Sequence, residues 1–154
     1  MTAPYQRSSV EGALASNDVR LARLESNSPI AHYEIKVVSD IDGLTVGAGQ
    51  FIFAIPYSID GWHLVTASGY VTTVGSTTTE VTIFNLNAPP GDEEMLQLTI
   101  LIPAGEYNSL GNTLANASVN PYQSVVATMD RISIDVLVAG TGAMGLGVIL
   151  EFKP

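Results

Sequence analysis

The stretch from Gly140 to Gly145, GTGAMG, matches the glycine pattern G-x-G-x-x-G of dinucleotide-binding domains. That chemistry needs a helix that begins at the glycines, because helix N–H groups hold the pyrophosphate, and an acid about twenty residues further on. Here the alternating segment LGVILEF follows instead of a helix. The sequence therefore predicts no nucleotide site, and we interpret the glycines as the tip of a β-hairpin, where glycine supplies a positive φ.

The side chains that usually perform catalysis are scarce. The two histidines are His32 and His63, and His63 lies in the strand-like segment GWHLV, where a packed or edge-exposed ring is favoured over a catalytic or metal role. The chain has no cysteine, no HExxH motif and no nucleophile elbow. We therefore expect a protein that is not an enzyme, with no catalytic residue, no bound metal and no cofactor.

Acidic residues form two short clusters. The segment SDIDG (39–43) has the spacing that begins a calcium loop, but Phe51 occupies the twelfth position, where the loop needs a bidentate Glu. The segment GDEEM (91–95) holds three consecutive carboxylates after two prolines. A turn is favoured for the first cluster and a solvated loop for the second, with a weak site for a hard cation as the alternative.

Three aromatic residues, Tyr57, Trp62 and Tyr70, cluster around one expected turn and strand. Their rings could stack on sugars, which would make them contact residues for a glycan. The alternative is ordinary packing in the core or at a subunit interface, where large aromatic rings are common.

The composition indicates one domain with an unusually apolar surface. Of 154 residues, 46% are hydrophobic and 14% are charged, against about 25% charged in ordinary soluble domains. This deficit suits either a membrane protein or a protein that covers its surface with partner subunits. The longest weakly polar run spans 15 residues (136–150), short of the roughly 20 that a membrane-spanning helix needs, and no apolar signal segment is present near residue 1. We expect no membrane association, and the lack of cysteine fits synthesis in a reducing cytoplasm.

The net charge of −9 is concentrated in the middle of the chain. Residues 37–130 contain nine acids and no Lys or Arg, whereas the remaining residues hold six acids and six bases. An acidic body of this kind repels phosphate backbones, so we expect no binding to nucleic acid.

Residues 1–30 are predicted to form a helical arm. Ser8 and Glu11 have the spacing of a capping box, and Pro29 disfavours helix in the residue before it. The seam residues, spaced alternately by four and three, are Val10, Leu14, Asn17, Leu21 and Leu24. This spacing is typical of a coiled coil with one polar seam residue, which would serve oligomerisation or attachment. The alternative is a single amphipathic helix that packs on its own domain.

Residues 31–154 are predicted to form an all-β domain. Short segments rich in Val, Ile, Thr and aromatic residues alternate with turn signals; they are 32–39, 49–56, 61–73, 79–86, 94–102, 123–129, 131–138 and 145–152. In the seventh segment, Ile132, Ile134, Val136 and Val138 are expected on one face, with Ser133 and Asp135 on the other. About eight strands without intervening helices predict an antiparallel β-sandwich or jelly roll.

The order of these parts resembles small virion proteins of tailed bacteriophages, which include capsid decoration (cement) proteins, head fibres and the β modules of tail fibres. The residues that carry the resemblance lie in 42–73, 94–109 and 130–152. In such proteins a similar strand and G(W)-x-L turn open the domain, and a similar D-x-(I/L)-x-(I/V)-D-V hairpin with GL-x-V-x-L-x-F closes it.

The resemblance implies a homotrimer on the surface of a capsid, made in the host cytoplasm and attached through its arm to the major capsid protein. The arm is far shorter than a fibre shaft, which favours a decoration or short head-fibre protein. The alternative is a receptor- or carbohydrate-binding module of a tail fibre that contacts a host-surface glycan.

Overall fold

The computed structural model describes residues 29–110 and 114–154, and this part of the chain is an all-β domain without an α-helix. The predicted antiparallel all-β class is thus confirmed for these residues, while the five seam residues of the predicted arm lie outside them. The nine strands are β1 (Ala31–Lys36), β2 (Gly47–Ala54), β3 (His63–Tyr70), β4 (Thr79–Asn85), β5 (Leu96–Leu98), β6 (Ile100–Ile102), β7 (Ser118–Val119), β8 (Arg131–Val138) and β9 (Gly147–Lys153). One turn of 3₁₀ helix, η1 (Tyr57–Ile59), precedes β3.

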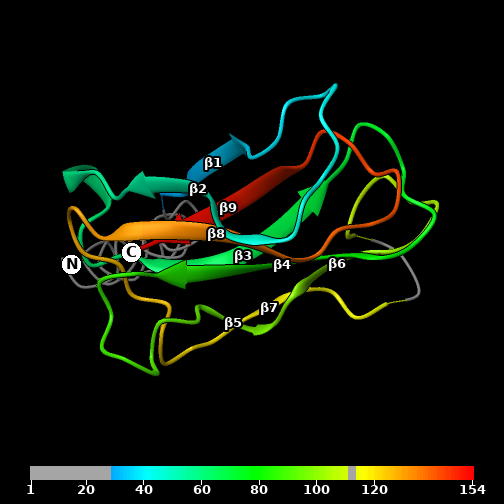
Figure 1. Ribbon diagram of the computed structural model, residues 1–154. Helices are drawn as coiled ribbons and strands as arrows, with labels where there is room; N and C mark the ends of the chain where they lie inside the picture. The colour runs from blue at the N-terminus through cyan, green and yellow to red at the C-terminus, as the bar shows by residue number, and fades with distance from the viewer. Residues whose placement is uncertain (1–28, 111–113) are drawn as a thin grey trace, which may run out of the picture.

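Two antiparallel sheets make up the body of the domain (Figure 1). One has three strands in the order β1-β9-β3, and the other has four in the order β2-β8-β4-β6. A third, two-stranded sheet pairs β5 with β7. Every pairing joins antiparallel strands, which is the arrangement expected of a sandwich-like all-β domain.

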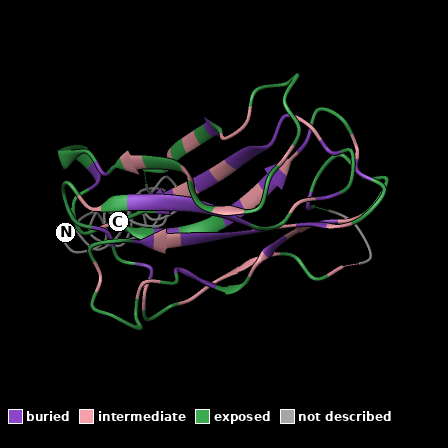
Figure 2. Ribbon diagram, viewed as in Figure 1, coloured by how far each residue is buried: buried purple, intermediate pink, exposed green. Residues whose placement is uncertain are grey.

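The core lies between the two larger sheets and consists mainly of branched aliphatic side chains. Its most deeply buried members include Ile83 of β4, Ile134 of β8, and Leu150 and Phe152 of β9. The central strands β8 and β9 are buried along most of their length, whereas β1 and β2 are largely exposed (Figure 2). The two central strands, which have partners on both edges, are thus buried over more of their length than the edge strands β1 and β2.

Two strand predictions were wrong in detail. The segment 94–102 divides at Thr99 into β5 and β6, which belong to different sheets, and the Thr99 hydroxyl donates to Glu80 Oε1 at 2.7 Å. The segment 123–129 is a loop with a single bridge between Val125 and His63. An Asn120 turn precedes this loop, with the Tyr122 N–H donating to Asn120 Oδ1 at 3.1 Å, and the pairing with the start of β3 stays limited to residues 124–126.

The hairpin interpretation of the glycine segment was also wrong. Strands β8 and β9 belong to different sheets, so residues 139–146 cross from one sheet to the other. Gly142 and Gly145 do adopt positive φ, at 79° and 67°. The crossing is held because Ala143 accepts from the Leu44 N–H and Met144 accepts from the Thr72 N–H, contacts with two other loops rather than with its own flanks.

The expected alternation of β8 fails at its end. Val138 is 44% exposed and does not continue the buried row of Ile132, Ile134 and Val136. The pairing with β4 skips Leu137, since Val81 pairs with Val136 and Glu80 with Val138. A bulge of this kind inserts one residue and breaks the two-residue period, which turns Val138 out of the core.

Candidate functional site

The outer face of the three-stranded sheet gathers the polar side chains of β1, β9 and β3 into cross-strand rows. Glu151 of β9 lies opposite His32 on one side and Thr66 on the other. The Thr66 hydroxyl donates to Glu151 Oε2 at 2.9 Å, and His32 Nδ1 lies 3.3 Å from Glu151 Oε1. The Thr66 hydroxyl, and after it the His32 ring, hold the pKa of the Glu151 carboxyl below its ordinary value.

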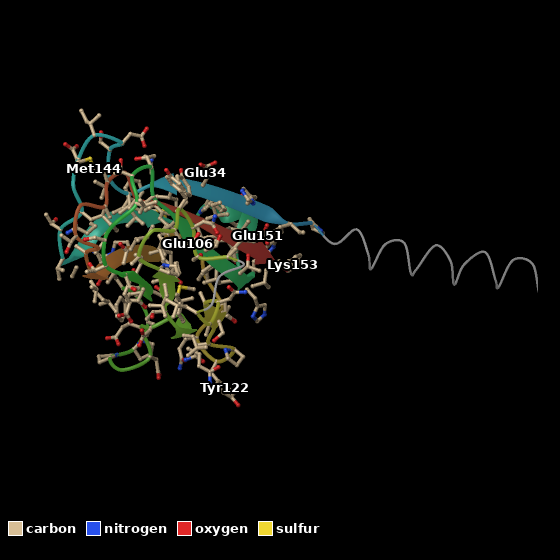
Figure 3. All side chains as sticks on the ribbon, turned by 90° about the vertical axis from the view of Figure 1, so that its right-hand side faces the viewer. Glu34, Glu106, Tyr122, Met144, Glu151 and Lys153 are labelled. Atoms are coloured by element: carbon tan, nitrogen blue, oxygen red, sulfur yellow. The ribbon has the colours of Figure 1, made fainter. Side chains whose placement is uncertain are left out.

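A second row on the same face is built around Tyr70. Its ring covers Gly147 of the neighbouring strand so closely that a Cβ there would lie 2.2 Å from Tyr70 Cζ. The Tyr70 hydroxyl donates to Glu34 Oε1 at 2.7 Å, and Lys36 Nζ lies 5.1 Å from the ring centroid. The bond to Glu34, with desolvation second, raises the pKa of Tyr70 to about 12. Glu34 and Glu151 lie on the same side of the ribbon in Figure 3.

A cavity of about 730 Å³ lies on this face beside the first row. Its lining combines apolar and polar side chains: His32, Val65, Thr66, Ala67, Ser68, Leu110, Asn116, Ala117, Ser118, Val119, Ile149 and Glu151. The size suits a small-molecule or monosaccharide-sized ligand. Hydroxyl, amide and carboxylate groups around an apolar floor can bind a neutral polar ligand.

The two acidic clusters do not converge on a cation. In the segment 91–95, Asp92 accepts from Gln123, Glu93 accepts from the Gly91 N–H and Glu94 accepts from Thr82. Within the described residues, no three His, Asp or Glu side chains are placed to hold a metal ion together. The carboxylates of the second cluster therefore serve separate loop contacts.

The three aromatic residues do not share one surface. Tyr57, in η1, is 82% exposed, and Trp62 lies just before β3, partly buried against the core. Tyr70 lies at the other end of β3. It is about 25 Å from Trp62, because an extended strand advances about 3.3 Å per residue. The structure thus brings Tyr57 and Trp62 together around one turn and separates Tyr70 from them.

Tyr57 and Trp62 belong to a loop cluster at one end of the sandwich, which we call the arm end. It comprises the loops 55–62, 86–95 and 120–130, next to the start of β1 and the last residues of β9 (left side of Figure 1). Backbone bonds join these loops, such as Met129 N–H to Ile55 O at 2.8 Å. Asp60 Oδ1 accepts from both the N–H and the hydroxyl of Thr128, and these bonds lower the pKa of Asp60.

The arm end exposes large apolar side chains: Tyr57, Leu86, Tyr122, Val125 and Met129, between 39% and 88% exposed. Exposed apolar groups gathered on one end are typical of a protein-contact surface. Sequence analysis missed this cluster because its loops lie far apart in the chain. It also missed the rows of the three-stranded sheet, although their polar residues recur with a two-residue spacing at 32, 34 and 36, at 66, 68 and 70, and at 151 and 153.

No protein-family model and no curated protein matches this chain. Among the described residues, no helix has both the length and the apolarity to cross a membrane.

Proposed function

We propose that this protein is a non-enzymatic structural protein of a bacteriophage virion. In this proposal it is a jelly-roll sandwich with a helical arm, assembled as a homotrimer. The arm attaches it to the major capsid protein, and it decorates or stabilises the capsid surface as a cement or short head-fibre protein.

The observation that carries the proposal is the position of the arm end. The described chain begins at Pro29 and enters β1 at Ala31, at the end of the sandwich that also exposes Tyr122, Val125 and Met129. An attachment through residues 1–28 would therefore press these apolar side chains against the same partner. The opposite end, with the crossing segment 139–146, would face outward.

The charge distribution supports a role in assembly. Residues 29–154 contain twelve acidic residues and three basic residues, which are Lys36, Arg131 and Lys153. A body with this charge avoids nucleic acid, and its few charges leave much apolar surface for subunits to cover.

The test is binding to capsid shells assembled from the major capsid protein of the phage in which this chain is proposed to act. We expect Tyr122→Asp, at the arm end, to weaken shell binding at least tenfold, and deletion of residues 1–28 to abolish it. Ile41→Asp is the matched control, because Ile41 is 83% exposed and Tyr122 is 88% exposed, but Ile41 lies at the opposite end. A chain that binds no shell, or that binds equally well in all three forms, would contradict the proposal.

A second candidate function is a glycan-binding module of a tail fibre, and the cavity beside Glu151 favours it. Its hydroxyl and amide groups are those that bind sugar hydroxyls. A glycan array probes this function directly, with Ser68→Ala in the cavity and Trp62→Ala at the arm end as variants. Loss of a glycan signal in the first variant alone would assign binding to the cavity, and loss in the second alone would assign it to the aromatic residues. An array without a signal would remove this candidate.

A further inference from the structure

Strand β2 is the edge of the four-stranded sheet, and its outer edge has no hydrogen-bonded neighbour in the described part of the chain. The strand and its flanks, residues 43–59, contain no charged side chain. Ile52 is 49% exposed and Phe51 is 37% exposed. An exposed, apolar, uncharged edge strand pairs readily with other chains, and proteins usually block such an edge with charges, prolines or covering loops.

Strand β3, at the edge of the other sheet, is covered by loops of its own chain. Its backbone is bonded by two loops: the Leu64 N–H donates to Ser124 O at 2.8 Å, and the Val71 N–H donates to Tyr107 O at 2.8 Å. Ser109 N–H also donates to Gly69 O at 2.9 Å. The chain thus protects β3 with its own loops and leaves β2 to be covered by something else.

The side of the sandwich between β1 and β2, which we call the open side, also exposes part of the interior. Tyr33 of β1 and Phe53 of β2 stack across the gap between the sheets, with ring centroids 6.2 Å apart, and neither is fully buried. Phe51 pairs with Ile134, whose side chain is in the core, yet it remains partly exposed. The two sheets are joined here by aromatic contact rather than by a closing strand.

We infer that the open side is the interface between copies of this chain, with the β2 edge and Ile52, Phe51 and Tyr33 covered by a second copy. The occupant follows from where the undescribed 28 residues end. Only Pro29 and Ile30 separate them from β1, a reach of about 10 Å at the length of an extended chain. Copies held together by residues 1–28 would therefore bring the starts of their β1 strands close to a common axis.

Charge favours the same side. Residues 29–154 of each copy carry a net charge of −9, so two copies repel one another wherever their acidic residues meet. The β2 edge offers a contact without a carboxylate, and half-buried aromatic rings at such a contact are the residues that interfaces favour. The inference rests on the homotrimer of the proposed function and names the surface that builds it.

The test measures the mass of the full chain by light scattering, with Ile52→Asp as the variant and Leu98→Asp as its matched control. Leu98 is also a strand residue that is 49% exposed, but it lies on β5, away from the open side. We expect a trimeric mass for the unaltered chain and for Leu98→Asp, and for Ile52→Asp at least a tenfold weaker association. An Ile52→Asp chain that associates as tightly as the control would overturn the inference while leaving shell attachment untouched.

Hydrogen exchange of the unaltered chain gives a second measurement that does not depend on the folding of a variant. We expect the amides of residues 51–54 to become more protected as protein concentration rises through the association range, with no such change in β3. Equal protection of β2 at all concentrations would overturn the inference. A chain that binds shells but stays monomeric would overturn the inference and the trimer together, and would leave the attachment role standing.

Discussion

The outer faces of the two large sheets both carry polar side chains, but these are buried on one sheet and exposed on the other. On the four-stranded sheet, Thr82, Ser133 and Asp135 are buried, and Asp135 Oδ1 accepts from both the Gly49 N–H and the Ser133 hydroxyl. On the three-stranded sheet, Glu34 and Glu151 bond to neighbours at the surface. The first face therefore uses polar groups to fix backbone geometry, and the second leaves them at the surface.

The reason for this difference lies in the bulge of β2. Between Gly47 and Phe51 the strand has extra residues opposite β8, and Gly49 adopts a φ of 63°. The bulge turns the Gly49 N–H toward Asp135 and covers the carboxylate. Buried polar groups are costly unless they are bonded, whereas exposed pairs contribute little to stability.

The largest effect is expected from Asp135→Ala. The change leaves the Gly49 N–H and the Ser133 hydroxyl without their acceptor in a buried place, which costs about 2–3 kcal/mol of the free energy of unfolding. For a chain of this length, the melting temperature should fall by about 5–10 °C in calorimetry. Asp135→Asn keeps one acceptor oxygen and should lose less than half as much. Equal losses in the two variants would show that the charge, not the acceptor, matters.

A smaller loss is expected from Gly147→Ala on the other sheet. The added Cβ would lie 2.2 Å from Tyr70 Cζ, so the ring must swing away from Glu34 and Lys36. We expect a loss of about 1–2 kcal/mol by chemical denaturation, since a packed ring and one charge-assisted hydrogen bond are disturbed. Tyr70→Phe is the control that keeps the ring, and it should cost less. A Gly147→Ala chain as stable as the unaltered one would show that the Tyr70 ring can move aside without loss of stability.

The titration of Tyr70 probes the same row without changing its packing. Because the pKa of Tyr70 is raised to about 12, the folded state holds its proton above the ordinary value of 10.0. The stabilisation is therefore complete below pH 10 and is lost as the pH rises toward 12. Tyrosinate absorbance, compared between the unaltered chain and Tyr70→Phe, should show one late-titrating tyrosine. A difference spectrum that titrates near 10 would contradict the bond to Glu34.

The smallest effect belongs to Glu151, which is at the surface. Its depressed pKa means that its contribution to stability is present above the ordinary value of 4.5 and is lost as the pH falls below it. Solvent screening keeps the contribution at a few tenths of a kcal/mol. Glu151→Gln should therefore flatten the acid limb of the stability curve slightly and leave the neutral region unchanged. A loss at neutral pH comparable to that of Asp135→Ala would remove the distinction between the two faces.

The sequence predicted the fold class because alternation along single strands is a local property. Segments such as 131–138 and 79–86 became β8 and β4 almost unchanged. Which sheet a strand joins is not local, and this is where prediction failed. The glycines before β9 have the positive φ of a turn, yet hydrogen bonds to Leu44 and Thr72 from distant loops turn the chain into the opposite sheet.

The candidate site was predictable only in part. The aromatic residues Tyr57 and Trp62 flank one turn, which their closeness in sequence indicates. Tyr70 was grouped with them by closeness in sequence, although eight residues of extended strand separate it from Trp62. The partners of Glu151 come from strands more than eighty residues earlier in the chain, and single-strand alternation does not specify such pairings.

The place of β9 in its sheet sets the order of events during synthesis. Strands β1 and β3 each pair with β9 and not with one another, so neither finds its partner until the ribosome has made residues that follow every other strand. The three-stranded layer thus forms through contacts that are distant in sequence, which slows folding. Until β9 is in place, Ile35 and Leu64 lack the strand that covers them, and exposed apolar side chains on a partly folded chain favour aggregation.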